Sequence, residues 1–413
     1  MNVKTDWFKN KDVSAETLLF GILAAGFFSM PLGTAPPTAL SIAAAAVWLL
    51  TGTAFRSREI YLRQPWCRPV YALILLPWVC LTYSPDPAGM GLDYAGKTHY
   101  WLYALAMAAV AARADRERLV QAFLAGLAAN AVVGGMQLAG LYPPTNGWYC
   151  GFGRGYSTLS AYLVLGMLMG SYYFRTLTDR RFRRLALCLT GFYFFHLVIL
   201  QGRTGYVTVV ALLPLILRNI LPRVHPVRVT AVCVLLAGLM FLSPIVRERV
   251  QFSVAQITYH IQADPEKAWG REYTDNLDRF YMWYGAVRIF LEHPVAGVGT
   301  GGFQAARLAM GKPGDPLIAH PHNDLLYMAA SYGLIGIAVF IWFFWTLLRN
   351  AWRERETAVG YFVLSCGLVV LVSGLLNAQI LDAGMAFLVA YAAGLQQGFS
   401  RPLTPQPKAT DRP

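Results

Sequence analysis

Long uninterrupted apolar runs recur along almost the whole chain, and they constrain its fold more than any other feature. Helical runs of about 17 to 25 apolar residues match the hydrocarbon thickness of a bilayer. The runs are continuous rather than alternating, which favours helices over barrel strands. Of 413 residues, 56% are hydrophobic and only 14% are charged, a balance far from that of a soluble domain. The sequence therefore predicts an all-α integral membrane protein.

We expect about twelve membrane-spanning helices within a single polytopic domain over residues 1–413. The first run follows a charged N-terminus and has no small-residue cleavage site before the next run. We therefore expect a retained helix rather than a signal peptide. The apolar runs lie at residues 15–33, 36–54, 69–84, 99–112, 118–140, 157–176, 185–201, 204–220, 228–244, 323–348, 357–376 and 380–397.

The distribution of Lys and Arg orients these helices. With the N-terminus placed inside, most of the 35 basic residues fall in inside segments, such as the group from Arg175 to Arg184, as the positive-inside rule requires. The short outside loops contain only Lys97, Arg154 and Arg203. We therefore expect both termini in the cytoplasm. The net charge of +13 is then a signal for anionic inner-leaflet lipid, not for nucleic acid.

One long polar segment, residues 245–322, interrupts the apolar runs before the third-last expected helix. On this orientation it lies outside, and residues 278–291 combine aromatic bulk with apolar residues at helical spacing, so we expect interfacial helices. The stretch Gly297–Gly302 lacks the preceding strand and following lysine of a nucleotide loop. We interpret it as a re-entrant turn whose backbone approaches a lipid headgroup. The Pro-rich tail, residues 401–413, is expected to be disordered and cytoplasmic.

Arginines on the outer side are candidates for binding an anion. Arg203 lies in a short Gln-Gly-Arg-Thr-Gly hinge between two expected helices; it is either an anchor for lipid headgroups or a functional residue. Arg279 opens the aromatic helix, where the helix dipole favours anions. The alternative for Arg279 is a surface pair with Asp275 or Asp278. Arg288 follows it more than two turns later.

The sequence His320-Pro-His322-Asn323-Asp324 ends the long segment where the chain re-enters the membrane. The neutral imidazole of His322 can act as a general base near neutral pH. The alternative is that a histidine beside an asparagine only caps a helix or donates a hydrogen bond. Asn323 is suited to cap the returning helix, and Asp324 should point along that helix.

Metal and disulfide chemistry have little support in the sequence. Asp264 and Glu266 are an acidic pair on the outer side, but no histidine lies at ligand spacing from them, so we expect no metal site. The six cysteines form no framework, and free thiols are expected. Cys80 and Cys150 are the only two that could meet on the outer side.

The order of these motifs resembles the O-antigen ligase and polymerase superfamily. The chain has the Gln-Gly-Arg-Thr-Gly hinge, a long outer segment with Arg279 before an aromatic helix, the string HPVAGVGTGGF, and HPHND followed by SYGLIGIAVF. Its length, number of apolar runs and large outer loop are most similar to those of the WaaL-type O-antigen ligases. The motifs cover about residues 200 to 345, and the topology covers the whole chain.

The resemblance implies a GT-C-like membrane glycosyltransferase of the bacterial inner membrane, acting in lipopolysaccharide biosynthesis. Such an enzyme transfers a glycan from undecaprenyl pyrophosphate to lipid A–core oligosaccharide on the periplasmic face, without cofactor, metal or ATP. It implies that Arg203 and Arg279 bind the donor pyrophosphate and that His322 is the catalytic base. The residues considered for supporting roles are His320, Asn323, Arg288 and Arg154.

The outer face combines one imidazole base with no second catalytic carboxylate, which favours a single displacement with inversion at the anomeric carbon. Two alternatives remain within the enzyme class, the repeat-unit polymerase and the protein O-oligosaccharyltransferase, because they share these motifs. A polysaccharide or lipid transporter is an alternative from another class, since about twelve helices would also suit an exporter. Against a transporter, the charged residues lie at helix ends or in loops.

Overall fold

A computed structural model of the chain describes residues 3–111, 115–145, 147–200, 202–262, 279–310 and 317–399. Within these ranges the regular structure consists of helices, with one isolated bridge between Thr145 and Trp148. The prediction of an all-α protein is therefore confirmed. Asp264, Glu266, Asp275, Asp278 and the tail 401–413 lie outside the described residues.

Each of the twelve expected apolar runs coincides with a helix. These helices are α1 (Val3–Ser29), α2 (Ala35–Leu50), α5 (Cys67–Cys80), α7 (His99–Ala111), α8 (Arg116–Leu138), α9 (Tyr156–Thr176), α10 (Arg180–Ile199), α11 (Arg203–Ile220), α12 (Pro226–Met240), α17 (Asp324–Arg353), α18 (Ala358–Gly374) and α19 (Ala383–Leu395). Short helices in the links are α3 (Thr53–Arg56), α4 (Arg58–Arg63), η1 (Leu81–Tyr83), η2 (Pro87–Gly91), α6 (Leu92–Gly96) and η3 (Gln396–Phe399).

The helices have the character of a membrane protein. By length and composition, α8, α10 and α17 could each cross a membrane, and several further helices, including α12 and α18, are apolar but shorter. In α12 only Val229 and Met240 are buried, and large apolar side chains such as Leu50 and Trp345 are exposed. Apolar surface of this extent would be unstable in water and is typical of helices that face lipid.

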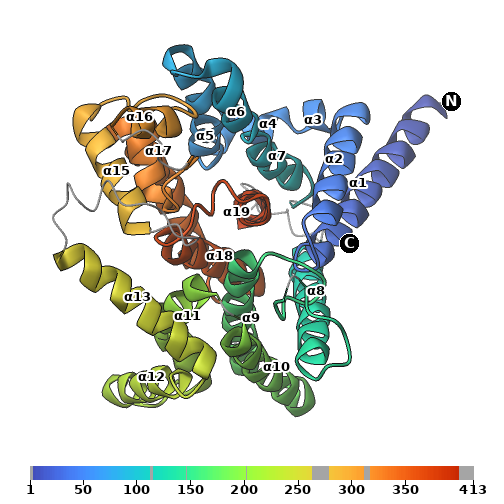
Figure 1. The fold of residues 1–413 in the computed structure, drawn as a ribbon. Coiled ribbons are helices and arrows are strands. Elements are labelled where there is room, and N and C mark those ends of the chain that lie inside the picture. The colour runs from blue at the N-terminus through green and yellow to red at the C-terminus, as the bar shows by residue number, and fades with distance from the viewer. Residues whose placement is uncertain are drawn as a thin grey trace.

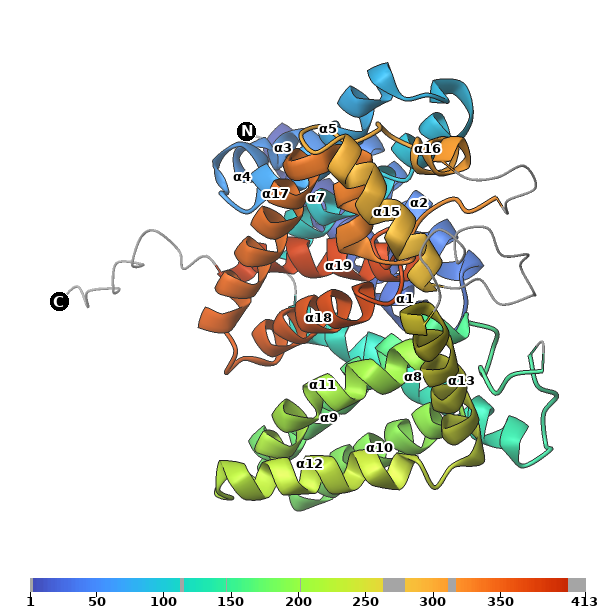
Figure 2. The same cartoon turned by 60° about the vertical axis from the view of Figure 1, so that its left-hand side comes forward.

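α19 is the central helix of the bundle. Figure 1 shows it surrounded by other helices, with α18, α7 and α17 among its neighbours, and every residue from Gly384 to Leu395 is buried. Its Tyr391 contacts the N-terminal helices, because the hydroxyl lies 2.8 Å from Ser41 Oγ and the ring lies 5.3 Å from that of Phe27. Figure 2 shows α9, α10, α11 and α12 as a second group of helices beside α8 and α18.

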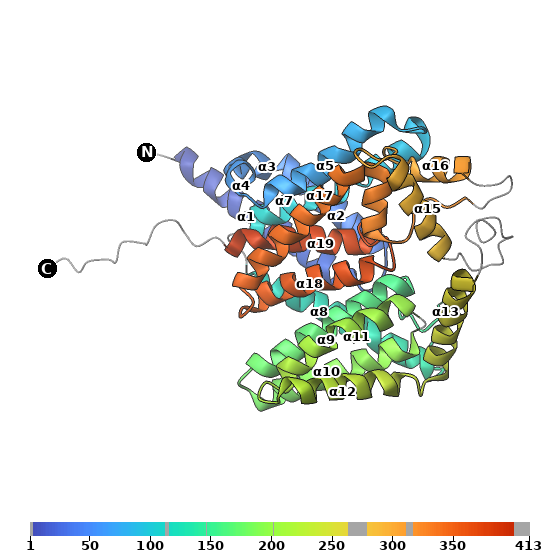
Figure 3. The same cartoon turned by 90° about the vertical axis from the view of Figure 1, so that its left-hand side faces the viewer.

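The two ends of the bundle differ in content. Figure 3 shows that α1 begins and η3 ends at one end. The opposite end contains α13 (Pro244–Gln262), α15 (Arg279–Glu292) and α16 (Phe303–Met310). These three helices belong to the long polar segment, so that segment gathers at the end remote from both described termini.

The glycine-rich stretch 297–302 packs against the chain's own backbone, which differs from the expected contact with a headgroup. Gly297, Gly299 and Gly301 have φ values of 65°, 84° and 74°, a region that residues with a Cβ rarely adopt. A Cβ on Gly297 would meet the backbone of Ser331, and a Cβ on Gly299 would meet that of Cys80. These glycines therefore serve close packing between α17 and the end of α5.

α17 is interrupted where this stretch meets it. Gly333 has φ 62° and ψ −149° inside the helix, and a Cβ there would meet the backbone of Val295. Because the helix is broken, Leu334 N donates to Pro294 O at 2.8 Å and replaces a bond within the helix. The kink separates the first turns of α17, which follow His322, from its long apolar part.

Candidate active site

Arg203, Arg279 and His322 come together although they belong to separate elements. Arg203 is the first residue of α11, Arg279 is the first described residue of α15, and His322 lies two residues before α17. The charge of Arg203 contributes to a lowered pKa at Arg279, and the charge of Arg279 contributes to a lowered pKa at His322. Charge effects of this kind act mainly over short distances, so the three side chains lie near one another.

The hinge before α11 places Arg203. Gly202 and Gly205 lie against Ser160 of α9, where a Cβ on either glycine would meet the Ser160 side chain. The hinge glycines thus let α11 start close to α9. Arg203 Nη1 donates to Ser253 Oγ of α13 at 3.2 Å, and its guanidinium lies 5.6 Å from the centre of the Phe252 ring. α13 therefore holds the Arg203 side chain from one side.

Arg279 is largely buried. Burial, reinforced by the charge of Arg203 and opposed by Tyr156, lowers its pKa to about 10. It therefore remains charged at neutral pH, but at a cost, because two neighbouring guanidinium groups repel each other in a dehydrated site. An anion placed between them would relieve both the desolvation and the repulsion.

A third arginine, Arg249, joins this group and was not singled out in the sequence. Its guanidinium lies 5.6 Å from the centre of the Trp148 ring, and Trp148 stacks on Tyr156 at 5.0 Å. Its backbone carbonyl accepts from Ser253 Oγ at 2.9 Å, the same hydroxyl to which Arg203 donates. Arg249 lies in α13, a helix without a recognisable motif, so only its basic charge on the outer side could have drawn attention to it.

His322 has an unusual backbone and a defined hydrogen bond. Its φ of 50° makes it the one non-glycine residue with positive φ in the described ranges. Its Nδ1 lies 3.1 Å from Asn377 Oδ1, in the link between α18 and α19. Burial lowers its pKa, the hydrogen bond to Asn377 acts in the opposite sense, and Arg279 lowers it further. The imidazole is therefore neutral near pH 7, as a general base must be.

His320 supports His322 rather than facing the arginines. The backbone N–H of His322 donates to His320 Nδ1 at 3.3 Å, and the two rings pack edge to face with centres 4.3 Å apart. Burial, then the charges of His322 and Lys97, lower the pKa of His320 to about 3. His320 is thus a neutral acceptor near pH 7 that stabilises the turn at His322.

Asn323 caps α17, as its sequence position predicted. Its Oδ1 accepts from Leu326 N at 3.0 Å, and its Nδ2 donates to Leu375 O at 2.9 Å. Asp324 does not point along the helix: it is buried, and its Oδ1 accepts from Ile380 N at 3.1 Å. Both side chains therefore fasten the start of α17 to the link between α18 and α19.

Arg154 and Arg288 lie in other environments. Arg154 is 1% exposed; its Nη1 donates to Gly33 O at 2.8 Å, and its Nη2 lies 3.6 Å from Asp382 Oδ1. A guanidinium enclosed in this way holds helices together and cannot reach a substrate. Arg288 is half-exposed and lies 3.6 Å from Glu292 one turn later, the geometry of a surface pair.

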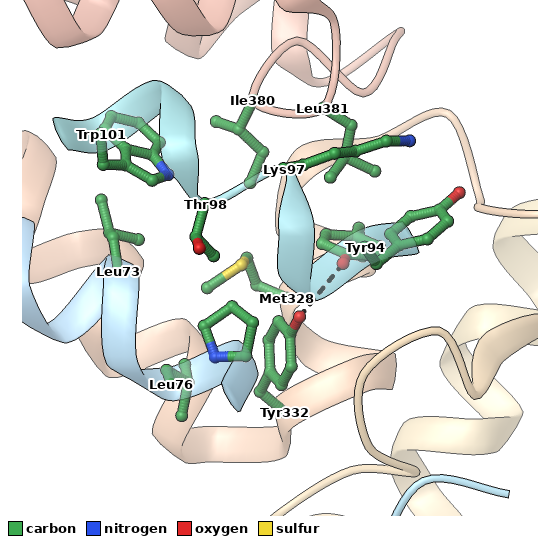
Figure 4. Close-up of a pocket in the computed structure, with 12 residues that line it drawn as sticks. Leu73, Leu76, Tyr94, Lys97, Thr98, Trp101, Met328, Tyr332, Ile380 and Leu381 are labelled. Carbon is green, nitrogen blue, oxygen red and sulfur yellow. Dashed lines mark hydrogen bonds between the residues drawn. The ribbon is translucent and has the colours of Figure 1, made fainter. Parts of the chain in front are cut away.

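A small apolar pocket lies near His320, and Figure 4 shows its lining. Lys97, whose charge acts on His320, lines it together with Trp101 and Tyr332, and the Tyr332 hydroxyl lies 3.1 Å from that of Tyr327. The cavity volume is about 40 Å³, little more than one water molecule occupies. The cavity is therefore too small to enclose a sugar ring.

The six cysteines are free thiols, as expected. Among the residues that the structure describes, no group of three or more His, Cys, Asp or Glu side chains is placed to hold a metal ion.

Residues 185–341 match the family model described as O-antigen ligase. No curated protein sequence matches the chain. The matched range contains Arg203, Arg249, Arg279 and His322, but not Asn377. This match supports the resemblance to the O-antigen ligase and polymerase superfamily that the motifs at about residues 200 to 345 carry.

Proposed function

We propose that the chain is an O-antigen ligase of the bacterial inner membrane that transfers a glycan from undecaprenyl pyrophosphate to lipid A–core oligosaccharide on the periplasmic face. The observation that carries this proposal is the convergence of Arg203, Arg279 and the half-buried, neutral imidazole of His322 at one end of an apolar bundle. A site of this kind suits a donor whose lipid lies in the membrane and whose pyrophosphate lies at its surface.

Arg203 and Arg279 would stabilise the leaving group. As the bond between the anomeric carbon and the pyrophosphate oxygen breaks, negative charge develops on that oxygen. Guanidinium groups can bind phosphate oxygens through two parallel hydrogen bonds, and such bonds are strongest where water is excluded. The bond that breaks in the activated donor supplies the free energy, so the reaction needs no ATP and should continue when divalent cations are chelated.

His322 would take the proton of the acceptor. The acceptor hydroxyl attacks the anomeric carbon, its O–H bond breaks, and the proton passes to the imidazole, while the electron pair of the broken bond leaves with undecaprenyl pyrophosphate. One base and one leaving group suffice for a single displacement, so the product linkage has the inverted configuration. NMR of the new glycosidic linkage tests this, and a trapped glycosyl-enzyme adduct would overturn it.

Reconstitution tests the function. The purified protein is placed in liposomes with a lipid-linked glycan and is offered lipid A–core, a second lipid-linked glycan or a serine-containing protein. Transfer to lipid A–core supports the ligase; transfer to the second glycan or to protein would instead establish a polymerase or a protein glycosyltransferase. Glycan that crosses the liposome membrane without transfer would establish a transporter.

Variants test the donor site in the same assay. Arg203→Ala and Arg279→Ala should abolish transfer, and Lys at either position should rescue poorly because it lacks the planar fork. Arg288→Ala is the matched control, since it removes an arginine from the same helix as Arg279 but from a surface pair. Full activity of either site variant in correctly inserted protein would refute the assignment.

A further inference from the structure

We propose that Asn377, held by Ser157, is a positioning residue that keeps the proton of His322 on Nδ1 and leaves Nε2 free to accept the proton of the acceptor. This inference rests on the proposed role of His322 as the base. It adds two residues from outside the matched family range, one in the link between α18 and α19 and one in the first turn of α9.

The direction of each hydrogen bond fixes the arrangement. Asn377 Nδ2 lies 3.0 Å from Ser157 Oγ and donates to it, which turns Asn377 Oδ1 towards His322 at 3.1 Å. A carbonyl oxygen only accepts hydrogen bonds, so the proton of a neutral His322 must be on Nδ1. The lone pair is then on Nε2, the atom that a base must present to the acceptor.

An amide suits this place better than a carboxylate. The charge of Arg279 contributes to the lowered pKa of His322. A carboxylate at position 377 would stabilise the charged imidazolium and would attract the Arg279 guanidinium away from the donor. The amide orients the ring without adding charge. It therefore fixes the tautomer while the imidazole remains a base, a combination that the buried aspartate of a hydrolase triad does not provide.

The link that contains Asn377 is fastened at several points. Asn323 donates to Leu375 O, Asp324 accepts from Ile380 N, and Asp382 pairs with the buried Arg154. The turn at His322 is in turn stabilised by His320. Since both partners of the hydrogen bond are anchored, the imidazole is held in one orientation, as a catalytic base needs to be.

Asn377→Leu and Asn377→Asp test the proposal in the reconstituted transfer assay. Asn377→Leu keeps the size but removes the acceptor of the His322 proton; we expect kcat to fall roughly 10- to 100-fold while the donor KM changes little. Asn377→Asp should move the acid limb of the kcat profile upward by about one pH unit or more, so that activity lost at pH 7 returns at higher pH. A purely structural asparagine would not produce that shift.

Asn350→Leu is the matched control, because the Asn350 side-chain amide donates a comparable hydrogen bond to Gln396 Oε1 at 2.9 Å near the far end of α17. The kcat and pH profile of this variant should match those of the wild type.

If Asn377→Leu does not accumulate in the membrane, Ser157→Ala, which releases the Asn377 amide, should show a smaller loss of kcat. If His322→Ala is inactive but Asn377→Leu keeps wild-type kcat and Asn377→Asp keeps the wild-type pH profile, the inference about Asn377 is refuted alone. If His322→Ala retains turnover, the proposed base is wrong as well.

Discussion

At the residue scale, burial and the charge of the neighbouring Arg203 both lower the pKa of Arg279. Bound phosphate oxygens would offset the repulsion between the two guanidinium groups, which would favour an anionic donor at this place. Arg249 adds a third cation from α13. Pyrophosphate carries more than one negative charge, and three arginines from three helices can divide it among them.

Arg249→Ala should therefore weaken donor binding without removing the base. We expect the donor KM to rise about tenfold, the effect of losing roughly 1.4 kcal/mol of interaction, with kcat less affected. Arg247→Ala is the control, since Arg247 is an exposed arginine of the same helix whose Nε donates to Phe241 O. An unchanged donor KM in Arg249→Ala, measured in liposomes, would exclude Arg249 from the donor site.

The positive φ of His322 determines which substitution isolates its chemistry. At φ 50°, histidine and alanine both bear the cost of placing a Cβ in the left-handed region, about 1 kcal/mol, whereas glycine adopts this conformation readily. We expect His322→Gly to be inactive but correctly folded, and to regain activity when free imidazole is added to the assay. No rescue at any imidazole concentration, in protein that still binds donor, would argue against a role as base.

At the scale of elements, the geometry of the candidate site depends on where α17 begins. The first turns of α17 follow His322 and are capped by Asn323, and the kink at Gly333 lets them turn against the 294–299 stretch. A straight helix through this point would displace the HPHND turn from the arginines of α11 and α15. The kink at Gly333 therefore lies outside the candidate site but determines where the HPHND turn lies within it.

Gly333→Ala should consequently reduce both stability and activity. Its φ and ψ of 62° and −149° belong to a region that only glycine populates, with a cost of about 1 to 3 kcal/mol for other residues, and the added Cβ would meet Val295. Gly191→Ala is the control, because Gly191 lies inside α10 with open space around it; its Tm should be unchanged or higher. Thermal unfolding in detergent distinguishes the two, and equal Tm values would contradict the role given to the kink.

The helices and part of the candidate site could be predicted from the sequence. The signal for the helices differs from the signal for the site residues. Apolar runs identify helices because the bilayer requires them, and Arg203 and His322 stood out because each lies at a boundary. Asn377 and Arg249 did not, since their importance arises only where distant elements meet. The break at Gly333 was hidden within a continuous apolar run, because a glycine inside a helical pattern is compatible with both a straight and a broken helix.

At the scale of the whole molecule, the two ends of the helical bundle carry different segments of the chain. The described termini gather at one end, while α13, α15 and α16 gather at the other (Figure 3). The arginine-rich start of α10 lies on the inside according to the positive-inside rule. On this proposed orientation the site would face the periplasm, where the proposed lipid-linked donor and lipid acceptor could meet in the same leaflet.

Cysteine labelling tests this orientation. Pro144 and Thr178 are exposed positions before and after α9, so they lie on opposite sides if α9 crosses the membrane. In an active background without native cysteines, a membrane-impermeant maleimide should label Pro144→Cys in intact cells, but should label Thr178→Cys only after the membrane is permeabilised. The reverse pattern would invert the topology and move the site to the cytoplasm.

The burial of α19 has a consequence for how the protein is made. The helix is enclosed by α1, α2, α7 and α18, and the ribosome completes all of these before α19 emerges. The helices that enclose α19 are therefore synthesised before it, and α19 packs between them late. Arg154 and Asp382, which lie 3.6 Å apart at the start of α19, meet only when α19 has packed, so a chain in which α19 fails to pack keeps the buried Arg154 without its carboxylate partner.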